Sequence, residues 1–213
     1  MRVLVTSASC GSHCGNKVEP QNNHTTDFIC LDSENYSTRN KSMRPRLVGK
    51  IPKMLAWHLY PGYDYYMWID QLFNLNNPDA ISWFINELGD HDALFFAHPY
   101  RSSIHSEYDF CKTAMNDNNQ YIIERYENED MDLQIKDYNL NQDYVDDLLI
   151  AAGAFIYKAS LVENKNYNVM KEWFFHNCIY SVQDQISLPF LLKRFDINYK
   201  LINSNIYSYE YLK

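Results

Sequence analysis

The stretch that decides the fold runs from Tyr63 to Asn74 and reads YDYYMWIDQLFN. Residues 65–69 are aromatic, β-branched or long and apolar, which is typical of a strand in the middle of a sheet. Asp70 follows directly, at the carboxyl end of that strand, where open α/β sheets place their ligands. Burying a carboxylate is costly unless a cation or hydrogen-bond donors compensate it. We therefore expect Asp70 to have a partner, for example a metal on a diphosphate; capping of the next turn is the alternative.

Segments with strand character alternate with helical ones along the rest of the chain. Strands are predicted at 2–8, 27–32, 92–97, 148–157 and 199–202, and helices at 48–59, 78–88, 160–176 and 182–195. The polar, acidic and tyrosine-rich stretch 105–147 predicts helices separated by Asn/Asp turns. This alternation predicts a single α/β domain with a mainly parallel mixed sheet flanked by helices.

Length, charge and hydropathy narrow the class of protein. A chain of 213 residues has room for one sizeable α/β domain. The formal net charge of −8 argues against a nucleic-acid partner, which needs a broad basic surface. The longest uncharged apolar run, residues 148–157, is too short to span a bilayer, and no signal peptide is expected before the first strand. The expectation is a cytoplasmic protein with no transmembrane segment.

Basic residues gather just before the Asp70 strand. Six of them fall within fifteen residues: Arg39, Lys41, Arg44, Arg46, Lys50 and Lys53. On an acidic protein such a cluster indicates a local anion site, such as the phosphates of a small ligand. The alternative is a solvated loop and helix face. If the anion site is real, charge reversal at Lys50 or Lys53 should weaken ligand binding in a salt-dependent way.

The five cysteines show no disulfide framework, and without a secretion signal they are expected to be reduced thiols. A tetrahedral zinc site is the alternative for part of this set. Its candidate ligands are Cys10, His13, Cys14, His24 and Cys30. Their spacing matches no standard zinc finger, and Cys30 reads as part of a strand, so we favour the thiols.

Two further clusters carry polar side chains suited to a site. His98, Arg101 and Glu107 follow directly after the strand at 92–97, where an Arg fork could bind a polyol or a phosphate. Asp184 lies in SVQDQ, between Gln183 and Gln185. Ser181 and Asp184 match a capping box, but the carboxylate could instead hold an acceptor hydroxyl and act as a general base. The small residues 151–154, Ala-Ala-Gly-Ala, allow close approach to a buried strand.

Taken in order, these motifs resemble a known family. They are Thr6-Ser7, Phe28–Asp32, Lys50–His58, Tyr63–Asp70, His98–Glu107 and Gln183–Pro189. The pattern, over roughly residues 2–203, is similar to the glycosyltransferase-like domains of bacterial polysaccharide loci and plant mucilage-related proteins. These are relatives of the GT-A nucleotide-sugar transferases. The resemblance implies a single GT-A-like domain over 1–213, with a nucleotide-sugar half (1–100) and an acceptor half (101–213).

The resemblance also implies an activity and a set of site residues. It implies transfer of a sugar from a nucleoside-diphosphate sugar to a hydroxyl acceptor, a glycan, in polysaccharide biosynthesis. Asp70 would face a metal ion, Mn²⁺ or Mg²⁺, or the diphosphate, and Asp184 and Glu107 would be catalytic. The expected donor-binding residues are Thr6, Ser7, Asp32, Arg44, Lys50, Lys53, His98, Arg101 and Gln185.

Two departures from the GT-A pattern put metal dependence in question. The second acid of the usual Asp-x-Asp is replaced by Leu72, and the histidine that many GT-A enzymes carry near the C-terminus is missing from 207–213. Two alternatives therefore stay open: a nucleotidyltransferase and a non-catalytic carbohydrate-binding domain, which the 18 tyrosines and four tryptophans would also suit. Dinucleotide-binding, P-loop and Gly-x-Ser-x-Gly motifs are absent.

Overall fold

Six strands form one sheet in the computed structural model, which describes residues 1–9, 13–32, 35, 43–163 and 168–213. The strands, in spatial order, are β2 (Thr25–Leu31), β1 (Arg2–Ala8), β3 (Tyr65–Ile69), β5 (Ile150–Lys158), β4 (Ala93–Ala97) and β6 (Tyr199–Ile202). β5 runs antiparallel to both of its neighbours, and the other three pairings are parallel. The mainly parallel mixed sheet predicted from the sequence is confirmed.

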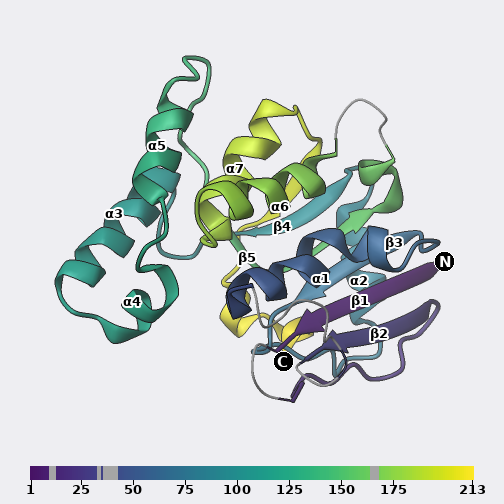
Figure 1. Ribbon diagram of the computed structural model, residues 1–213. Coiled ribbons are helices and arrows are strands. Elements are labelled where there is room, and N and C mark those ends of the chain that lie inside the picture. Colours follow the sequence, from purple (N-terminus) through teal and green to yellow (C-terminus); the bar gives the residue numbers. More distant parts are fainter. Residues whose placement is uncertain (10–12, 33–34, 36–42, 164–167) are drawn as a thin grey trace.

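Helices cover both faces of this sheet (Figure 1). They are α1 (Pro45–Leu59), α2 (Ala80–Leu88), α3 (Ile104–Asn116), α4 (Gln120–Tyr126), α5 (Met131–Asn139), α6 (Val169–Ile179) and α7 (Asp184–Arg194). Short 3-10 turns are η1 (Ala159–Val162), η2 (Ile206–Ser208) and η3 (Glu210–Leu212).

Alternation along the strands divides the core into two layers. On β3, Tyr66 and Trp68 pack with α1, α6 and α7, whereas Met67 and Ile69 point to the opposite face. That opposite face is covered by α2 and the C-terminal 3-10 turns. The strand that the sequence places at the centre of the sheet is therefore buried on both sides, and it delivers Asp70 to the carboxyl edge.

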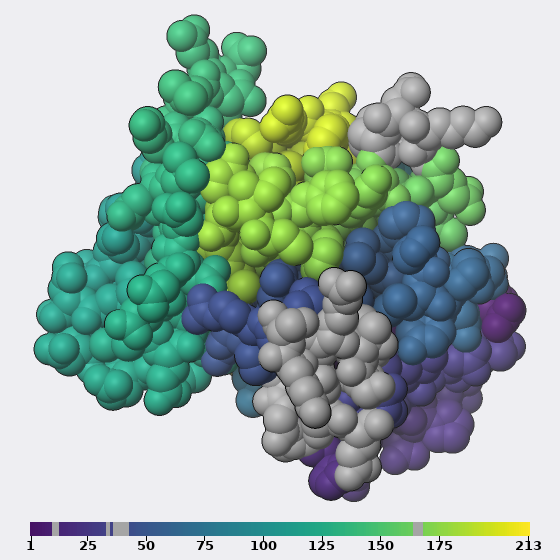
Figure 2. Space-filling view, viewed as in Figure 1, coloured from purple at the N-terminus to yellow at the C-terminus, as the bar shows by residue number. Residues whose placement is uncertain are grey.

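The stretch 105–147 forms α3, α4 and α5, in agreement with the predicted helices and Asn/Asp turns. Asn118 and Asn128 occupy the turns with φ of 58° and 64°, a left-handed conformation that asparagine tolerates well. Figures 1 and 2 show this teal segment standing as a group at one side of the sheet, beside α6 and α7.

Several predicted helix boundaries were wrong; α1, for example, begins at Pro45 rather than at residue 48. The helix predicted at 160–176 is instead the turn η1 and the later helix α6, which begins after Asn168; the Asn168 side chain accepts from Lys171 N and caps it. The helix predicted from Pro78 begins at Ala80, so the proline precedes it rather than occupying its first turn. Among the described residues, no helix is long and apolar enough to cross a membrane.

Candidate functional site: a charged cleft at the carboxyl edge of the sheet

A cleft of about 880 Å³ opens at the carboxyl ends of β1, β3 and β4. Its floor includes Ala8, Asp70 and His98, the residues at or just beyond those strand ends, together with Ala152 and Gly153 of β5. Its walls come from the N-terminal turns of α1 and α7, from α3 and α4, and from η2. This is the edge at which open α/β sheets bind ligands.

Helix α1 brings basic side chains to the cleft. Arg46, Lys50 and Lys53 are spaced i, i+4, i+7, so they share one helical face. Arg44 precedes the helix and pairs with Glu129, which joins α1 to the segment before α5. Of the predicted cluster, Arg39 and Lys41 lie outside the described residues. The rest gather at the cleft.

Asp184 is the counter-ion of both α1 lysines. Its Oδ2 lies 2.6 Å from the Nζ atoms of Lys50 and Lys53, and its side chain is buried. Burial acts to raise the pKa of this carboxyl, but the two ammonium groups outweigh it and hold the pKa at about 2. The first turn of α7 also favours a negative charge there. Asp184 is therefore an anion at any ordinary pH.

The capping box that stood as the alternative for Asp184 does not form. The residue that precedes α7 is Gln183, and neither its side chain nor that of Asp184 caps the helix. Ser181 instead donates to Gln134 Oε1 at 2.8 Å. Because Asp184 is bonded to lysines from another helix, its role is tertiary rather than local.

The two lysines respond differently to their surroundings. Burial lowers the pKa of Lys50 in spite of Asp184. Burial acts in the same direction on Lys53, but Asp184 and Asp70 outweigh it and raise the pKa of Lys53. The Lys53 Nζ lies 3.8 Å from Asp70 Oδ1 and 5.5 Å from the Trp68 ring centroid. Lys53 thus links the two aspartates across the floor of the cleft.

Asp70 reaches the cleft as predicted, with 43% of its side chain exposed. Trp68 donates to its Oδ1 from the indole nitrogen at 2.8 Å, and the Asp70 backbone N–H donates to Gly153 O at 2.7 Å. A Cβ at Gly153 would lie 3.2 Å from Asp70 Oδ2 and 2.9 Å from the Phe73 ring. The small residue allows the close approach that the sequence suggested.

His98, Arg101 and Glu107 also come together at the cleft. Arg101 forms an ion pair with the buried Glu107, whose Oε1 accepts from Gln183 at 2.5 Å. His98 Nδ1 accepts the backbone N–H groups of Tyr100 and Arg101. Burial and then the Arg101 charge lower the pKa of His98 to about 4, so the ring is neutral at pH 7. Gln185 lines the same cleft and donates to Ile150 O.

Three of the predicted donor-binding residues do not line the cleft. Thr6 is buried beneath it, with its hydroxyl 3.2 Å from Pro52 O, and Ser7 donates to Asn16 Oδ1. Asp32 accepts from Asn35 N in a turn after β2. Thr6 is thus turned toward α1 rather than into the cleft.

Gln71 and Asn74, which follow Asp70 and carry side-chain oxygen atoms suited to a metal ion, are engaged elsewhere. Gln71 donates to Ser7 and Asn16 and accepts from Gly15 N, and Asn74 Oδ1 accepts from Lys17 N. Within the described part of the chain, no three His, Cys, Asp or Glu side chains are grouped as metal ligands. Asp70 is thus a single half-exposed carboxylate, which fits an ion whose other ligands arrive with a phosphate.

The prediction that all cysteines are reduced was wrong for two of them. Cys14 and Cys30 form a disulfide, with Cα atoms 6.0 Å apart. Parallel pairing of β1 and β2 sets Cys30 beside Ser7, close to the segment that follows β1 and carries Cys14. The zinc alternative loses these two candidate ligands; Cys10 lies outside the described residues.

Several residues of the cleft were missed by sequence reasoning. The walls include the aromatic residues Phe110, Tyr121 and Tyr207 and the cation Arg125, whose Cζ lies 4.0 Å from the Tyr121 ring centroid. Three of them, Phe110, Tyr121 and Arg125, come from the polar stretch 105–147, where no spacing distinguishes a cleft-lining side chain from an exposed one. Their partial exposure is visible only once the helices are placed.

An α/β sheet with a charged cleft at its carboxyl edge is typical of a ligand-binding domain. A match to a known family identifies the kind of domain more closely. Residues 37–211 match the TOD1/MUCI70 glycosyltransferase-like domain, and the chain belongs to that family. The resemblance seen in the sequence is confirmed. No curated protein matches the chain.

Solved structures show distant likenesses. A197 from STIV has a TM-score of 0.36 at 10% identity, covering 96% of this chain and 83% of its own. The 4-diphosphocytidyl-2C-methyl-D-erythritol synthase of Anaerococcus prevotii has a TM-score of 0.44 at 10% identity, covering 97% and 90%. Mouse xyloside xylosyltransferase 1 has 0.44 at 8% identity, covering 84% and 63%. These TM-scores are too low to carry a functional argument.

Proposed function

We propose that this glycosyltransferase-like domain is an active GT-A-type enzyme that transfers a sugar from a nucleoside-diphosphate sugar to a hydroxyl of a glycan acceptor. The observation that carries the proposal is the charge of the cleft. Its lining holds six Lys and Arg side chains and four Asp and Glu side chains, a balance of +2, in a chain whose net charge is −8. Such a local reversal of sign attracts a small anion.

Lys50 and Lys53 are the groups that we assign to the donor diphosphate. Both line the cleft, and Asp184 holds them side by side; it neutralises one of their two charges, and the half-exposed Asp70, 3.8 Å from Lys53, offsets part of the other. Positive charge fixed in advance stabilises the negative charge that develops on a leaving diphosphate. An acceptor hydroxyl held in line with the anomeric carbon then attacks with a reduced entropic barrier.

Asp184 is better suited to positioning these lysines than to removing a proton. A general base works best when its pKa lies near the working pH, and the pKa of Asp184 is about 2. Glu107 is likewise engaged, with Arg101 and Gln183. We therefore propose that Asp184 and Glu107 orient cations, and that Asp70, the half-exposed carboxylate, faces the reacting groups.

Asp70 would also hold Mn²⁺ or Mg²⁺ if the donor brings one. Its single carboxylate suits an ion that takes its remaining ligands from phosphate oxygens and water, as Mg²⁺ commonly does. When bound, such an ion would offset the charge of the diphosphate. Lys53, 3.8 Å from Asp70 Oδ1, supplies part of the same compensation from the protein.

Product analysis tests the proposal. The chain would be incubated with a panel of nucleoside-diphosphate sugars, glycan acceptors and Mn²⁺, and we expect release of a nucleoside diphosphate with a sugar added to the acceptor. Release of pyrophosphate in a parallel incubation with nucleoside triphosphates and sugar phosphates would instead make it a nucleotidyltransferase. Sugar binding without nucleotide binding would leave a carbohydrate-binding domain. Asp70→Asn is the diagnostic variant, expected to keep the melting temperature and lose turnover.

A further inference from the structure

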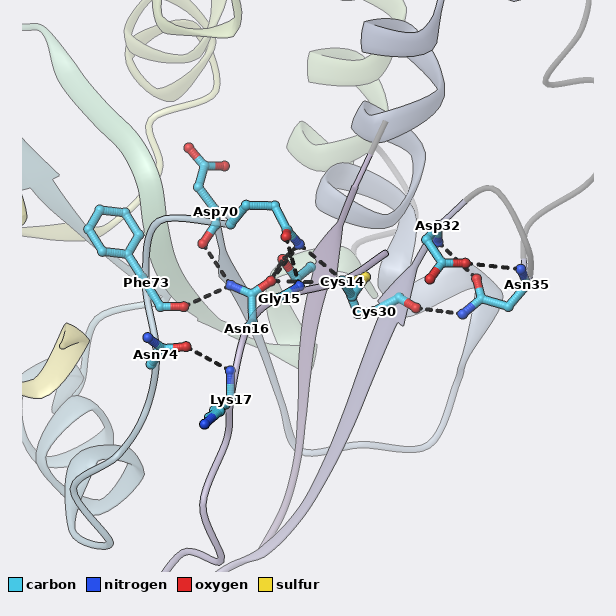
Figure 3. The surroundings of a disulfide bond; sticks show 12 residues. Cys14, Gly15, Asn16, Lys17, Cys30, Asp32, Asn35, Asp70, Phe73 and Asn74 are labelled. Carbon is cyan, nitrogen blue, oxygen red and sulfur yellow. Dashed lines mark hydrogen bonds between the residues drawn. A yellow bond between two sulfur atoms is a disulfide. The ribbon is translucent and has the colours of Figure 1, made fainter. Parts of the chain in front are cut away.

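The turn that carries Asp70 is held by one side chain from a distant loop, Asn16 (Figure 3). Its Nδ2 donates to Asp70 O at 2.9 Å and to Phe73 O at 2.7 Å. Its Oδ1 accepts from Ser7 Oγ at 2.9 Å and from Gln71 Nε2 at 2.5 Å. An amide offers two donor hydrogens and two acceptor lone pairs, so Asn16 uses all of its capacity here.

Both backbone polar groups of Asp70 are consequently fixed. Its N–H donates to Gly153 O of β5, and its C=O accepts from Asn16. The first contact comes from the sheet, and the second comes from the loop after β1. With both ends of the residue held, the direction in which the carboxylate leaves the backbone depends on Asn16.

The loop runs alongside the turn for several residues. Leu75 N donates to Lys17 O at 2.9 Å, and Glu19 N donates to Leu75 O at 3.0 Å. Lys17 N donates to Asn74 Oδ1 at 2.7 Å. Asn16 is thus the cleft-side end of a short parallel bridge between the two segments.

A covalent bond anchors this arrangement two residues before Asn16. The Cys14–Cys30 disulfide ties the loop to the end of β2, and Gln71 Nε2 lies 3.3 Å from Cys30 Sγ. Figure 3 shows the disulfide, Asn16 and the Asp70 turn side by side. The loop therefore has one covalent attachment to β2 and one hydrogen-bonded attachment to the Asp70 turn.

We propose that Asn16 is a positioning residue for Asp70, and that the Cys14–Cys30 disulfide holds Asn16 in place. The inference rests on the proposed function, because it takes the ligand that binds beside Asp70 to be a nucleoside diphosphate. It makes donor affinity dependent on the oxidation state of a cystine that does not itself line the cleft.

The first experiment compares Asn16→Ala with Asn22→Ala as the control. Asn22 lies on the same loop, and its side chain donates to Asp79, away from the cleft. Calorimetry with a panel of nucleoside diphosphates and Mg²⁺ measures affinity, at a temperature where each variant is folded. We expect about tenfold weaker binding for Asn16→Ala, since a misplacement of roughly 1 Å at a site can cost up to about a hundredfold. Asn22→Ala should bind like the wild type.

Amide hydrogen exchange supplies a readout that does not need the ligand. The N–H groups of Phe73 and Leu75 donate to Asp70 O and Lys17 O, so both should exchange faster in Asn16→Ala. A purely structural role would lower the melting temperature and leave the affinity of the folded protein unchanged, which would overturn the positioning role. If the wild type binds no nucleoside diphosphate, the proposed function fails. Unchanged exchange at Phe73 and Leu75 in Asn16→Ala would separately overturn the role of Asn16 in holding the Asp70 turn.

The second experiment tests the disulfide. Alkylation of the non-reduced protein, followed by peptide mass spectrometry, should find Cys14 and Cys30 linked; free thiols at both would overturn this part. Cys14→Ser combined with Cys30→Ser should weaken nucleoside-diphosphate binding and speed exchange at Leu75. The control is Cys178→Ser, which removes an exposed free thiol. Equal affinity in the double variant and the control would show that Asn16 acts without the cystine.

Discussion

Asp184 shows how one buried charge can organise a site. Its carboxylate contacts two ammonium groups from α1, and removing it would leave Lys50 without its counter-ion and the buried Lys53 with only the more distant Asp70. Breaking a buried ion pair by removing one partner typically costs about 3–5 kcal/mol. The carboxylate is thus as important for stability as for the charge pattern of the cleft.

Asp184→Asn is therefore expected to lower the free energy of unfolding by roughly 3 kcal/mol at pH 7, because the amide cannot neutralise Lys50 or Lys53. Urea denaturation measures this. Asp90→Asn, at an exposed position after α2, is the control and should change little. A loss as small as that of the control would mean that the lysines find other compensation.

The charge on Lys50 gives a second expectation at the scale of the residue. Lys50→Gln keeps the Lys53–Asp184 pair and removes the positive excess, so donor binding should weaken, and the difference from the wild type should shrink as salt rises. Lys136→Gln, an exposed position on α5, serves as the control. Equal affinities for Lys50→Gln and wild type at low salt would return the basic cluster to the solvated-face interpretation.

Sequence analysis identified many of these residues because the apolar pattern indicates where in a strand or helix each residue lies. A carboxylate that ends a buried aromatic strand must lie at a sheet edge, and that placed Asp70 correctly. The pairing of Asp184 with α1 joins residues more than 130 positions apart, and no local spacing encodes it. For the same reason the local pattern also allowed a short-range capping box, which does not form.

At the scale of the element, β5 and the Asp70 turn touch through Gly153. A side chain there would press on the Phe73 ring, which is itself buried. Gly153→Ala should destabilise the fold by about 1–3 kcal/mol, typical of overpacking a well-packed site, and should displace Asp70. Thermal denaturation and nucleotide affinity measure the two effects.

The matched control for this change is Gly15→Ala. A Cβ at Gly15 would meet Gln71 Oε1 at 3.9 Å, an ordinary contact. Nearly equal melting temperatures for the two alanine variants would show that the Phe73 ring can move aside at little cost, contrary to the expectation.

For elements, periodicity predicted the type of structure more reliably than the boundaries. All six strands lie where the apolar runs placed them. The α6 start was missed because it is set by Asn168, a single capping residue, and not by the apolar pattern that extends through residues 160–176. The disulfide was missed because it depends on which strands are neighbours, information that local sequence does not contain.

For the whole molecule, the buried His176 and the partly buried His98 predict sensitivity to acid. Burial, and then Arg101 and Arg194 respectively, lower the pKa values of His98 and His176 to about 4. In the unfolded chain these rings take up protons near pH 6.5. Between pH 6.5 and 4 the unfolded state therefore binds more protons, so stability falls as the pH is lowered through this range.

Urea midpoints measured from pH 7 to 4 should decrease accordingly, and His176→Gln should flatten the slope. His58→Gln, at an exposed position on α1, should not. Below about pH 4, protonation of Asp184 adds a second loss, since its folded pKa of about 2 lies below the usual value of 3.8. A slope that His176→Gln leaves intact would assign the acid sensitivity to other groups.

The antiparallel strand β5 has a consequence for synthesis of the chain. It pairs with β3 on one side and β4 on the other, yet it emerges from the ribosome some eighty residues after β3. Until then β4 has no neighbour that connects it to β1–β3. Long-range pairing of this kind slows folding, and exposed strand edges invite aggregation. Until its final third is made, the nascent chain therefore holds a β2–β1–β3 sheet and an unpaired β4, both with edges open to other chains.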